Sequence, residues 1–180
     1  MLTLIIEGTE FYDETTNTFS TVGDTTLEFE HSLVSLSKWE SIFEKPFLSP
    51  GEKTSNEIFS YIEAMVITQD YDPASIRRLT QEKLNQINQY IESKQSATTF
   101  GIMPETTGRG ETITSELVYY WLVAFNIPFE CQYWHLNRLF ALIRICNIKN
   151  SKPKKMSRAE MAQRNRDLNA QRRAQLNSTG

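Results

Sequence analysis

The hydrophobic pattern of the chain changes its period near Ser32. Before that point, Leu27 and Phe29 alternate with Glu28 and Glu30 in a threonine-rich stretch, which is typical of a strand with one exposed face. After it, apolar residues recur every three or four positions, as they do on one side of a helix. The sequence therefore predicts an α+β fold that is mainly α: a short N-terminal antiparallel β meander, then a helical bundle and a basic C-terminal helix.

The expected meander has three short strands, at 2–6, 18–22 and 25–30, with 13–17 as its first loop. Three short strands with one wet face are marginal alone, so their apolar face should pack on the helices or on a neighbouring chain. Unpaired strand edges also pair readily with other chains. We therefore expect a homo-oligomer in which the meander contributes to the contact.

Helix-start signals recur after the meander. Two segments match the capping box, in which a hydroxyl and a glutamate three residues later satisfy two backbone N–H groups: Ser37-Lys38-Trp39-Glu40 and Thr54-Ser55-Asn56-Glu57. They accompany expected helices at 33–45 and 55–67. Asp72-Pro73 and Thr80 predict two more helix starts. The segment 113–126 is apolar around nearly its whole circumference and should be the central buried helix, followed by a long helix at 129–148.

Charge divides the chain at Lys149. The residues before it include 10 basic and 20 acidic ones, a net charge of −10, whereas those from Lys149 onward include 9 basic and 2 acidic ones, a net charge of +7. A terminal helix at about 157–176, introduced by a third capping box at Ser157, has too few apolar residues to be stable alone. We therefore expect three parts: a meander at 1–31, a helical body at 32–150, and a basic linker and arm at 151–180. Such an arm is expected to meet something acidic: nucleic acid, the body of the protein, or a partner.

The sequence contains no recognisable set of catalytic residues. His31 and His135 are the only imidazoles and lie in no nucleophile motif, and the seven glycines include no phosphate-cradling spacing. Cys131 and His135, four apart on one expected helix, share a face as metal ligands do, but zinc needs three or four ligands, and packing is the commoner role of such residues. We expect a protein that is not an enzyme, with no catalytic residue, metal site or cofactor.

The two cysteines, Cys131 and Cys146, cannot form the disulfide framework of a small secreted protein, which favours a reduced, intracellular setting. The longest apolar run, 117–125, has nine residues, about half of what a bilayer-spanning helix requires. No membrane partner is therefore expected.

Two groups of residues are candidates for binding a partner. The first is an unusual density of large aromatic residues: Tyr119, Tyr120, Trp121, Tyr133 and Trp134. Tyrosine and tryptophan are enriched in protein–protein contacts, although burial in the core would equally account for them. The second is a set of arginines in the terminal helix: Arg164, Arg166, Arg172 and Arg173. Arginine can contact phosphates and base edges, yet the acidic body would repel nucleic acid, so a protein partner is favoured over nucleic acid.

Several blocks of the sequence resemble small structural-cassette proteins of tailed bacteriophages. They are Glu30-His31-Ser32-Leu33-Val34-Ser35-Leu36-Ser37-Lys38-Trp39-Glu40, Lys45-Pro46-Phe47-Leu48, Tyr119-Tyr120-Trp121, Asn126-Ile127-Pro128-Phe129-Glu130-Cys131, Trp134-His135-Leu136-Asn137-Arg138 and Arg164-Asn165-Arg166-Asp167-Leu168-Asn169. In size, acidic helical body and basic end, the chain most resembles the tail assembly chaperones among them.

This resemblance implies a protein that holds the long, aggregation-prone tape measure protein in solution while the tail tube protein polymerises around it, in the cytoplasm of an infected bacterium. That family has no catalytic motif to carry over. The same composition also suits a structural virion component, such as a head–tail connector, neck or scaffold protein. A protein that binds nucleic acid through the basic arm is a third alternative.

Overall fold

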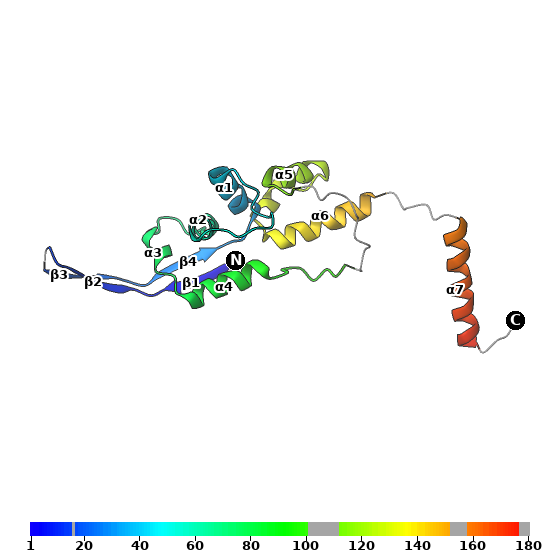
Figure 1. Ribbon diagram of the computed structural model, residues 1–180, viewed down its shortest axis with the longest axis horizontal. Helices are drawn as coiled ribbons and strands as arrows, with labels where there is room; N and C mark the ends of the chain where they lie inside the picture. The colour runs from blue at the N-terminus through cyan, green and yellow to red at the C-terminus, as the bar shows by residue number, and fades with distance from the viewer. Residues whose placement is uncertain (16, 101–111, 152–157, 177–180) are drawn as a thin grey trace. The chain divides into compact units, whose positions relative to one another are not determined.

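The computed structural model describes residues 1–15, 17–100, 112–151 and 158–176. It divides the chain into two compact units, Met1–Asn147 and Ile148–Gly180. The predicted fold class is confirmed, because an N-terminal antiparallel β structure is followed by a mainly helical chain (Figure 1).

The β structure is one long antiparallel hairpin in two parts. Strand β1 (Leu2–Ile6) pairs with β4 (Thr25–Phe29), and β2 (Thr9–Asp13) pairs with β3 (Thr18–Val22), so the second pair extends the first (Figure 1). Strand β2 was not expected from the sequence. The chain passes from one part to the other at Gly8, whose N–H donates a 2.8 Å hydrogen bond to Asp24 Oδ1. A side chain at Gly8 would lie 2.2 Å from the Val22 carbonyl oxygen, so the close approach requires glycine.

The inner face of β1 and β4 packs on helices α1 (Leu33–Phe43), α2 (Ser55–Met65), α3 (Ala74–Arg77) and α4 (Gln81–Glu92). This first hydrophobic cluster includes Leu4, Ile6, Leu27, Phe29, Trp39, Ile62, Met65, Ile76 and Ile87, all buried. Leu4 opposes Leu27 in the ladder, and Leu2 opposes Phe29. Of the two coverings expected for the apolar face, helices or a neighbouring chain, helices cover that of β1 and β4.

Of the two capping boxes predicted for α1 and α2, one is confirmed and one is wrong. Thr54 caps α2 as expected, since its side chain accepts from the Glu57 N–H and the Glu57 carboxylate accepts from the Thr54 N–H. The box expected at Ser37 is wrong. Helix α1 begins five residues earlier, where Ser32 and Ser35 form the capping box, and Ser37 lies inside the helix.

A second hydrophobic cluster surrounds α5 (Ser115–Ala124), the 3₁₀ helix η1 (Phe129–Tyr133) and α6 (Leu136–Asn150). Its buried residues are Leu33, Leu36, Val118, Leu122, Ile127, Cys131, Leu136, Leu139 and Ile143. The single long helix expected at 129–148 is interrupted at Trp134, whose backbone is extended. Leu33 and Leu36 belong to α1, so that helix contributes to both clusters.

Helix α5 is not the central buried helix that its composition predicted. Val118 and Leu122 are fully buried, but Tyr120 and Val123 are 64% and 60% exposed. A helix that is apolar on every side is either surrounded by protein or exposes apolar residues. Here only one side is covered, by α1 and α6, so α5 lies at the surface of its unit.

The second unit contains α7 (Arg158–Leu176). Every side chain described in this helix is exposed, including Met161 and Leu168. The capping box expected at Ser157 lies outside the described residues. Within the described part of the chain, no helix has the length and apolar composition needed to cross a membrane.

Candidate protein-binding surface

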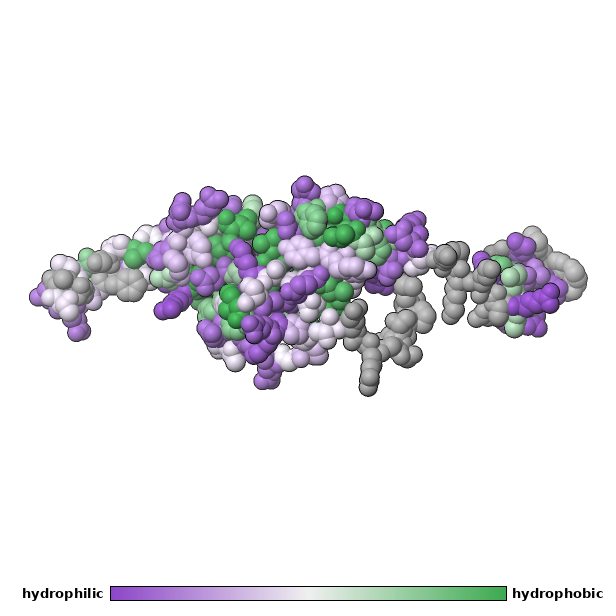
Figure 2. All heavy atoms as spheres, turned by 90° about the horizontal axis from the view of Figure 1, so that it is seen from above, coloured by the Kyte–Doolittle hydropathy of each residue, from purple (hydrophilic) through white to green (hydrophobic). Residues whose placement is uncertain are grey.

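Apolar and aromatic side chains are exposed together along α5 and η1. We call this surface the aromatic face and define it as Tyr119, Tyr120, Val123, Phe129 and Tyr133. Tyr133 is 64% exposed and Phe129 52%, and Tyr120 and Val123 are exposed to a similar degree. In Figure 2, hydrophobic surface is visible over the part of the first unit that α5 occupies. Large apolar side chains that remain in water side by side commonly mark a contact surface.

The position of α5 follows from its N-terminus and its buried side. Thr114 caps the helix by accepting a hydrogen bond from the Leu117 N–H, and Glu40 of α1 accepts one from the Ser115 N–H at 2.7 Å. Val118 and Leu122, four apart, then pack into the second cluster. Tyr120 and Val123 are consequently directed away from the core.

A tight turn places η1 beside α5. Asn126 adopts a left-handed backbone conformation (φ 51°), and the Ile127 N–H donates to the Leu122 carbonyl at 2.8 Å. Pro128 precedes η1. Tyr119 connects the two elements, because its hydroxyl donates to Gln132 Oε1 at 3.0 Å and its ring lies 6.4 Å from that of Phe129. The aromatic face is therefore held by backbone and side-chain contacts rather than by a mobile loop.

The five aromatic residues singled out in the sequence do not act as one group. Tyr120 and Tyr133 are exposed, whereas Tyr119, Trp121 and Trp134 are half-buried and pack against the second cluster. The Arg138 guanidinium lies 4.1 Å from the Trp134 ring centre. Sequence reasoning missed Val123 and Phe129. Val123 could have been found from its spacing, since it is three residues after Tyr120 on the same helix.

The arginines singled out in the sequence lie on α7, in the other unit. Arg164, Arg166, Arg172 and Arg173 are all exposed. Arg166 and Arg173, seven apart, share one side of the helix, whereas Arg164 points to roughly the opposite side. The positive charge therefore surrounds the helix instead of forming a single stripe.

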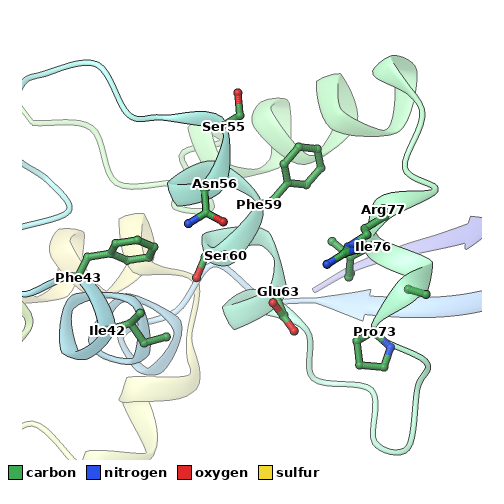
Figure 3. A pocket seen from close by; sticks show the side chains of 11 residues that line it. Ile42, Phe43, Ser55, Asn56, Phe59, Ser60, Glu63, Pro73, Ile76 and Arg77 are labelled. Carbon is green, nitrogen blue, oxygen red and sulfur yellow. The ribbon is translucent and has the colours of Figure 1, made fainter.

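A groove of about 870 Å³ lies between α1, α2 and α3 (Figure 3). Phe43 and Ile42 line it from α1, Phe59 and Glu63 from α2, and Ile76 from α3. It differs from the aromatic face because polar and charged groups share its walls. The sequence offered no signal for it, since its walls come from three separate helices.

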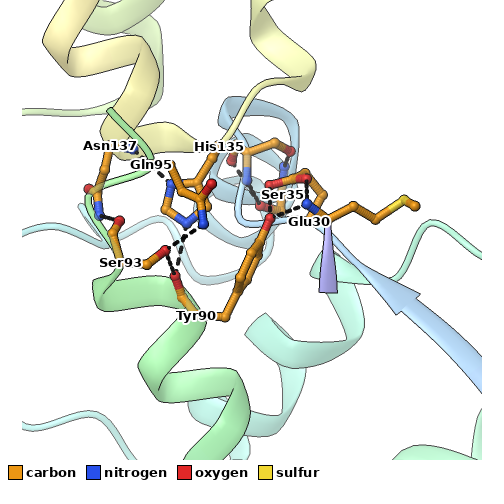
Figure 4. Close-up of polar contacts among 9 residues, drawn as sticks. Glu30, Ser35, Tyr90, Ser93, Gln95, His135 and Asn137 are labelled. Carbon is orange, nitrogen blue, oxygen red and sulfur yellow. Dashed lines mark hydrogen bonds and ion pairs between the residues drawn. The ribbon is translucent and has the colours of Figure 1, made fainter. Parts of the chain in front are cut away.

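A polar network joins the two hydrophobic clusters. His31 Nδ1 lies 2.6 Å from the Tyr61 hydroxyl, and the His31 ring centre is 5.1 Å from that of His135. His135 Nε2 contacts the Tyr90 carbonyl at 3.0 Å, and the Tyr90 hydroxyl donates to Glu30 Oε1 at 2.7 Å (Figure 4). Burial, with a smaller contribution from His135, lowers the pKa of His31 to about 4.

The two histidines, Tyr61 and Cys131 all lie in the interior of the fold. Both histidines are buried, and burial also lowers the pKa of His135 and raises that of Tyr61. Cys131 packs in the second cluster, where burial raises its pKa and keeps the thiol protonated. Among the described residues, no group of three or more His, Cys, Asp or Glu side chains is placed to hold a metal ion.

Comparison of the chain with protein-family models, with curated protein sequences and with solved structures found no significant match. Its function is therefore inferred from its own surfaces and from the blocks of sequence quoted above.

Proposed function

We propose that the protein is a non-enzymatic chaperone of bacteriophage tail assembly that binds the tape measure protein through the aromatic face of α5 and η1. The observation that carries this proposal is the exposure of four large apolar or aromatic side chains on α5 and η1: Tyr120, Val123, Phe129 and Tyr133. The sequence blocks that resemble tail assembly chaperones supply the identity of the partner. Part of this surface, Tyr120 and Phe129, lies within those blocks.

The chemistry of the aromatic face suits a long helical partner. A helix of an aggregation-prone protein presents an apolar stripe, and aromatic side chains cover such a stripe with little loss of conformational entropy. The hydroxyl groups of Tyr120 and Tyr133 also accept and donate hydrogen bonds, so the surface tolerates water when the partner is absent. Binding that must later be reversed favours such a mixed surface over a purely aliphatic one.

The charge of the body supports the same role. The part of the chain before Lys149 has a net charge of −10, which would keep a complex with an apolar partner dispersed through electrostatic repulsion between complexes. In this proposal, the complex acts in the cytoplasm of the infected cell while tail tube subunits assemble.

Co-expression with the tape measure protein of the same genome tests the proposal. The full chain should keep most of that partner in the soluble fraction and co-elute with it. The double variant Tyr120→Ser, Tyr133→Ser should lose this effect several-fold without unfolding, because both residues are exposed. Ile42→Ser is a matched control, since Ile42 is 65% exposed but lies on α1, at the groove.

Two results would count against the proposal. If the partner is equally insoluble with and without the full chain, the chaperone role is wrong. If Ile42→Ser abolishes binding and the tyrosine variant does not, the groove and not the aromatic face is the binding surface.

A structural virion component is the second candidate, and the extended β2–β3 hairpin favours it. A hairpin with exposed strand edges suits a protein that links neighbouring subunits in a particle. Mass spectrometry of purified virions separates the two roles. A chaperone should be absent from mature particles, whereas a connector or neck protein should be present at a fixed copy number.

A further inference from the structure

The β2–β3 half of the hairpin extends past the helices of its unit (Figure 1). In the described residues, each of these two strands pairs only with the other. None of their described side chains belongs to either hydrophobic cluster. A two-stranded hairpin without a hydrophobic face to cover is marginally stable in water. We infer that the outer edge of β3, the one turned away from β2, pairs with β3 of a second copy of this chain, which joins two hairpins into one four-stranded antiparallel sheet.

The two edges of the hairpin differ in charge, and this difference favours β3 over β2 as the strand that pairs with a second copy. Strand β2 carries Glu10 and Asp13, whereas β3, Thr18-Phe19-Ser20-Thr21-Val22, has no charged residue. Charged residues on an edge strand oppose pairing with another chain. Pairing two copies through β2 would bring four carboxylates into adjacent strands. Pairing through β3 leaves those carboxylates on the outer strands of the sheet.

The sequence of β3 is self-complementary in antiparallel pairing. A two-fold axis at Ser20 places Phe19 opposite Thr21 of the second copy and Thr18 opposite Val22. Pairs of an aromatic with a β-branched residue, and of two β-branched residues, stabilise antiparallel sheets. Such an isologous contact closes at two copies, whereas pairing of β2 with β3 would continue into a filament.

The proposed sheet would also cover exposed aromatic rings of the β2–β3 hairpin. Phe19 is 74% exposed and Tyr12, its partner in the ladder, is 50% exposed; their ring centres are 4.9 Å apart. A second copy would cover Phe19 first, because Phe19 lies on the strand at the centre of the four-stranded sheet. Tyr12 would lie on an outer strand.

Matched substitutions of Phe19 and Tyr12, which are paired in the ladder, test the inference with the purified full chain. Phe19→Lys and Tyr12→Lys each remove the same ring pair and add one positive charge. Light scattering should show a dimer for the unaltered chain, and Phe19→Lys should raise the dissociation constant of this dimer at least tenfold. Tyr12→Lys should change it by less than threefold. A monomeric unaltered chain, or an equal effect of the two substitutions, would overturn the inference.

Cross-linking locates the edge directly. Glu10 and Thr21 face each other in the ladder, so Glu10→Cys and Thr21→Cys place a thiol at the same level of the hairpin on different strands. Because Glu10→Cys also removes a carboxylate from β2, it favours cross-linking through β2 if that edge is the contact. With strands about 4.8 Å apart, the two copies of position 21 would lie within about 8 Å and those of position 10 at about 14 Å or more. In a Cys146→Ser background, a short bismaleimide should cross-link Thr21→Cys and not Glu10→Cys. The reverse pattern, or cross-linking of neither variant, would show that the β3 edge is not the contact.

Because both tests use the chain alone, their outcome does not depend on whether the tape measure protein is its partner.

Discussion

Glu40 and Ser115, 75 residues apart in the chain, are joined by a hydrogen bond in which the Ser115 backbone N–H donates to Glu40 Oε2 at 2.7 Å. The other carboxylate oxygen, Oε1, accepts from the Phe47 N–H at 2.9 Å. Ser115 is the first residue of α5, where backbone N–H groups have no partner within the helix. One buried carboxylate therefore fixes both the start of α5 and the chain that follows α1.

We predict that Glu40→Ala destabilises the protein by about 3 kcal/mol, because it leaves two backbone N–H groups without their charged acceptor. Urea denaturation at neutral pH measures the loss. Glu44→Ala is the control: Glu44 is an exposed carboxylate at the end of the same helix, and its substitution should cost less than about 0.5 kcal/mol. Equal effects of the two substitutions would show that Glu40 has no special role.

The buried pair of His31 and His135 predicts acid sensitivity. The pKa of His31 is about 4 in the folded protein and near 6.5 in the unfolded chain, so between these values the unfolded state binds more protons. Stability should therefore be highest above pH 6.5 and fall as pH decreases toward 4, by at most about 3 kcal/mol. The lowered pKa of His135 acts in the same direction.

Urea midpoints at pH 7 and pH 5 measure this slope in the unaltered chain and in His31→Gln. The variant should lose less stability between the two pH values, whatever its stability at pH 7. A slope that His31→Gln leaves unchanged would mean that other groups cause the acid sensitivity.

Glu57 predicts a separate effect at lower pH. Its pKa is lowered to about 2, first by the hydrogen bond from Lys45 Nζ at 2.9 Å and then by the backbone N–H and the hydroxyl of Thr54. The stability that this carboxylate contributes is present above pH 4.5 and is lost as pH falls toward 2. Lys45→Met should raise the pKa of Glu57 more than Thr54→Ala does. A carbon-detected NMR titration of the Glu57 carboxyl group ranks the two variants, and the opposite order would contradict the prediction.

Local patterns in the sequence predicted some local structures correctly and others wrongly. The Thr54 box lies within one turn of helix and needs no distant partner, which is why it could be identified. The Ser37 box failed because a serine and a glutamate three apart also occur inside a helix by chance, and the true start at Ser32 uses a second serine. Strand β2 was missed because its charged residues, Glu10 and Asp13, interrupt the expected strand pattern.

Contacts between distant residues could not be predicted from one sequence. His31 and His135 are neighbours because the segment that follows β4 pairs with the start of α6, through the Ser32–His135 bridge and the hydrogen bond from the Leu136 N–H to the His31 carbonyl. The role of Glu40 depends on α5, 75 residues later. Composition also misjudged α5. An apolar helix that is buried on every side and one that leaves a side exposed have the same sequence pattern. The density of aromatic residues therefore could not show which of them are buried and which are exposed.

The arginines of helix α7 lie outside both hydrophobic clusters. Replacing Arg164, Arg166, Arg172 and Arg173 by glutamine should weaken assembly with a protein partner and leave the thermal midpoint of the first unit nearly unchanged. The reason is that α7 belongs to the second unit and both hydrophobic clusters lie in the first. Calorimetry measures the midpoint, and Asn169→Ala with Gln171→Ala is a control that alters α7 without changing its charge. A large fall in the midpoint would show that α7 contributes to the stability of the first unit.

A salt titration then identifies what the arginines bind. The residues from Lys149 onward carry a net charge of +7, and the charge surrounds α7, which suits a diffuse contact with an acidic surface better than a groove of DNA. With a protein partner, we expect amide protection of α7 that the four-glutamine variant loses. Gel shifts with duplex DNA should show weak binding at physiological salt, where the Debye length is about 8 Å. Tight DNA binding with a steep dependence on salt would instead favour the nucleic-acid role, because each phosphate contact adds to the slope.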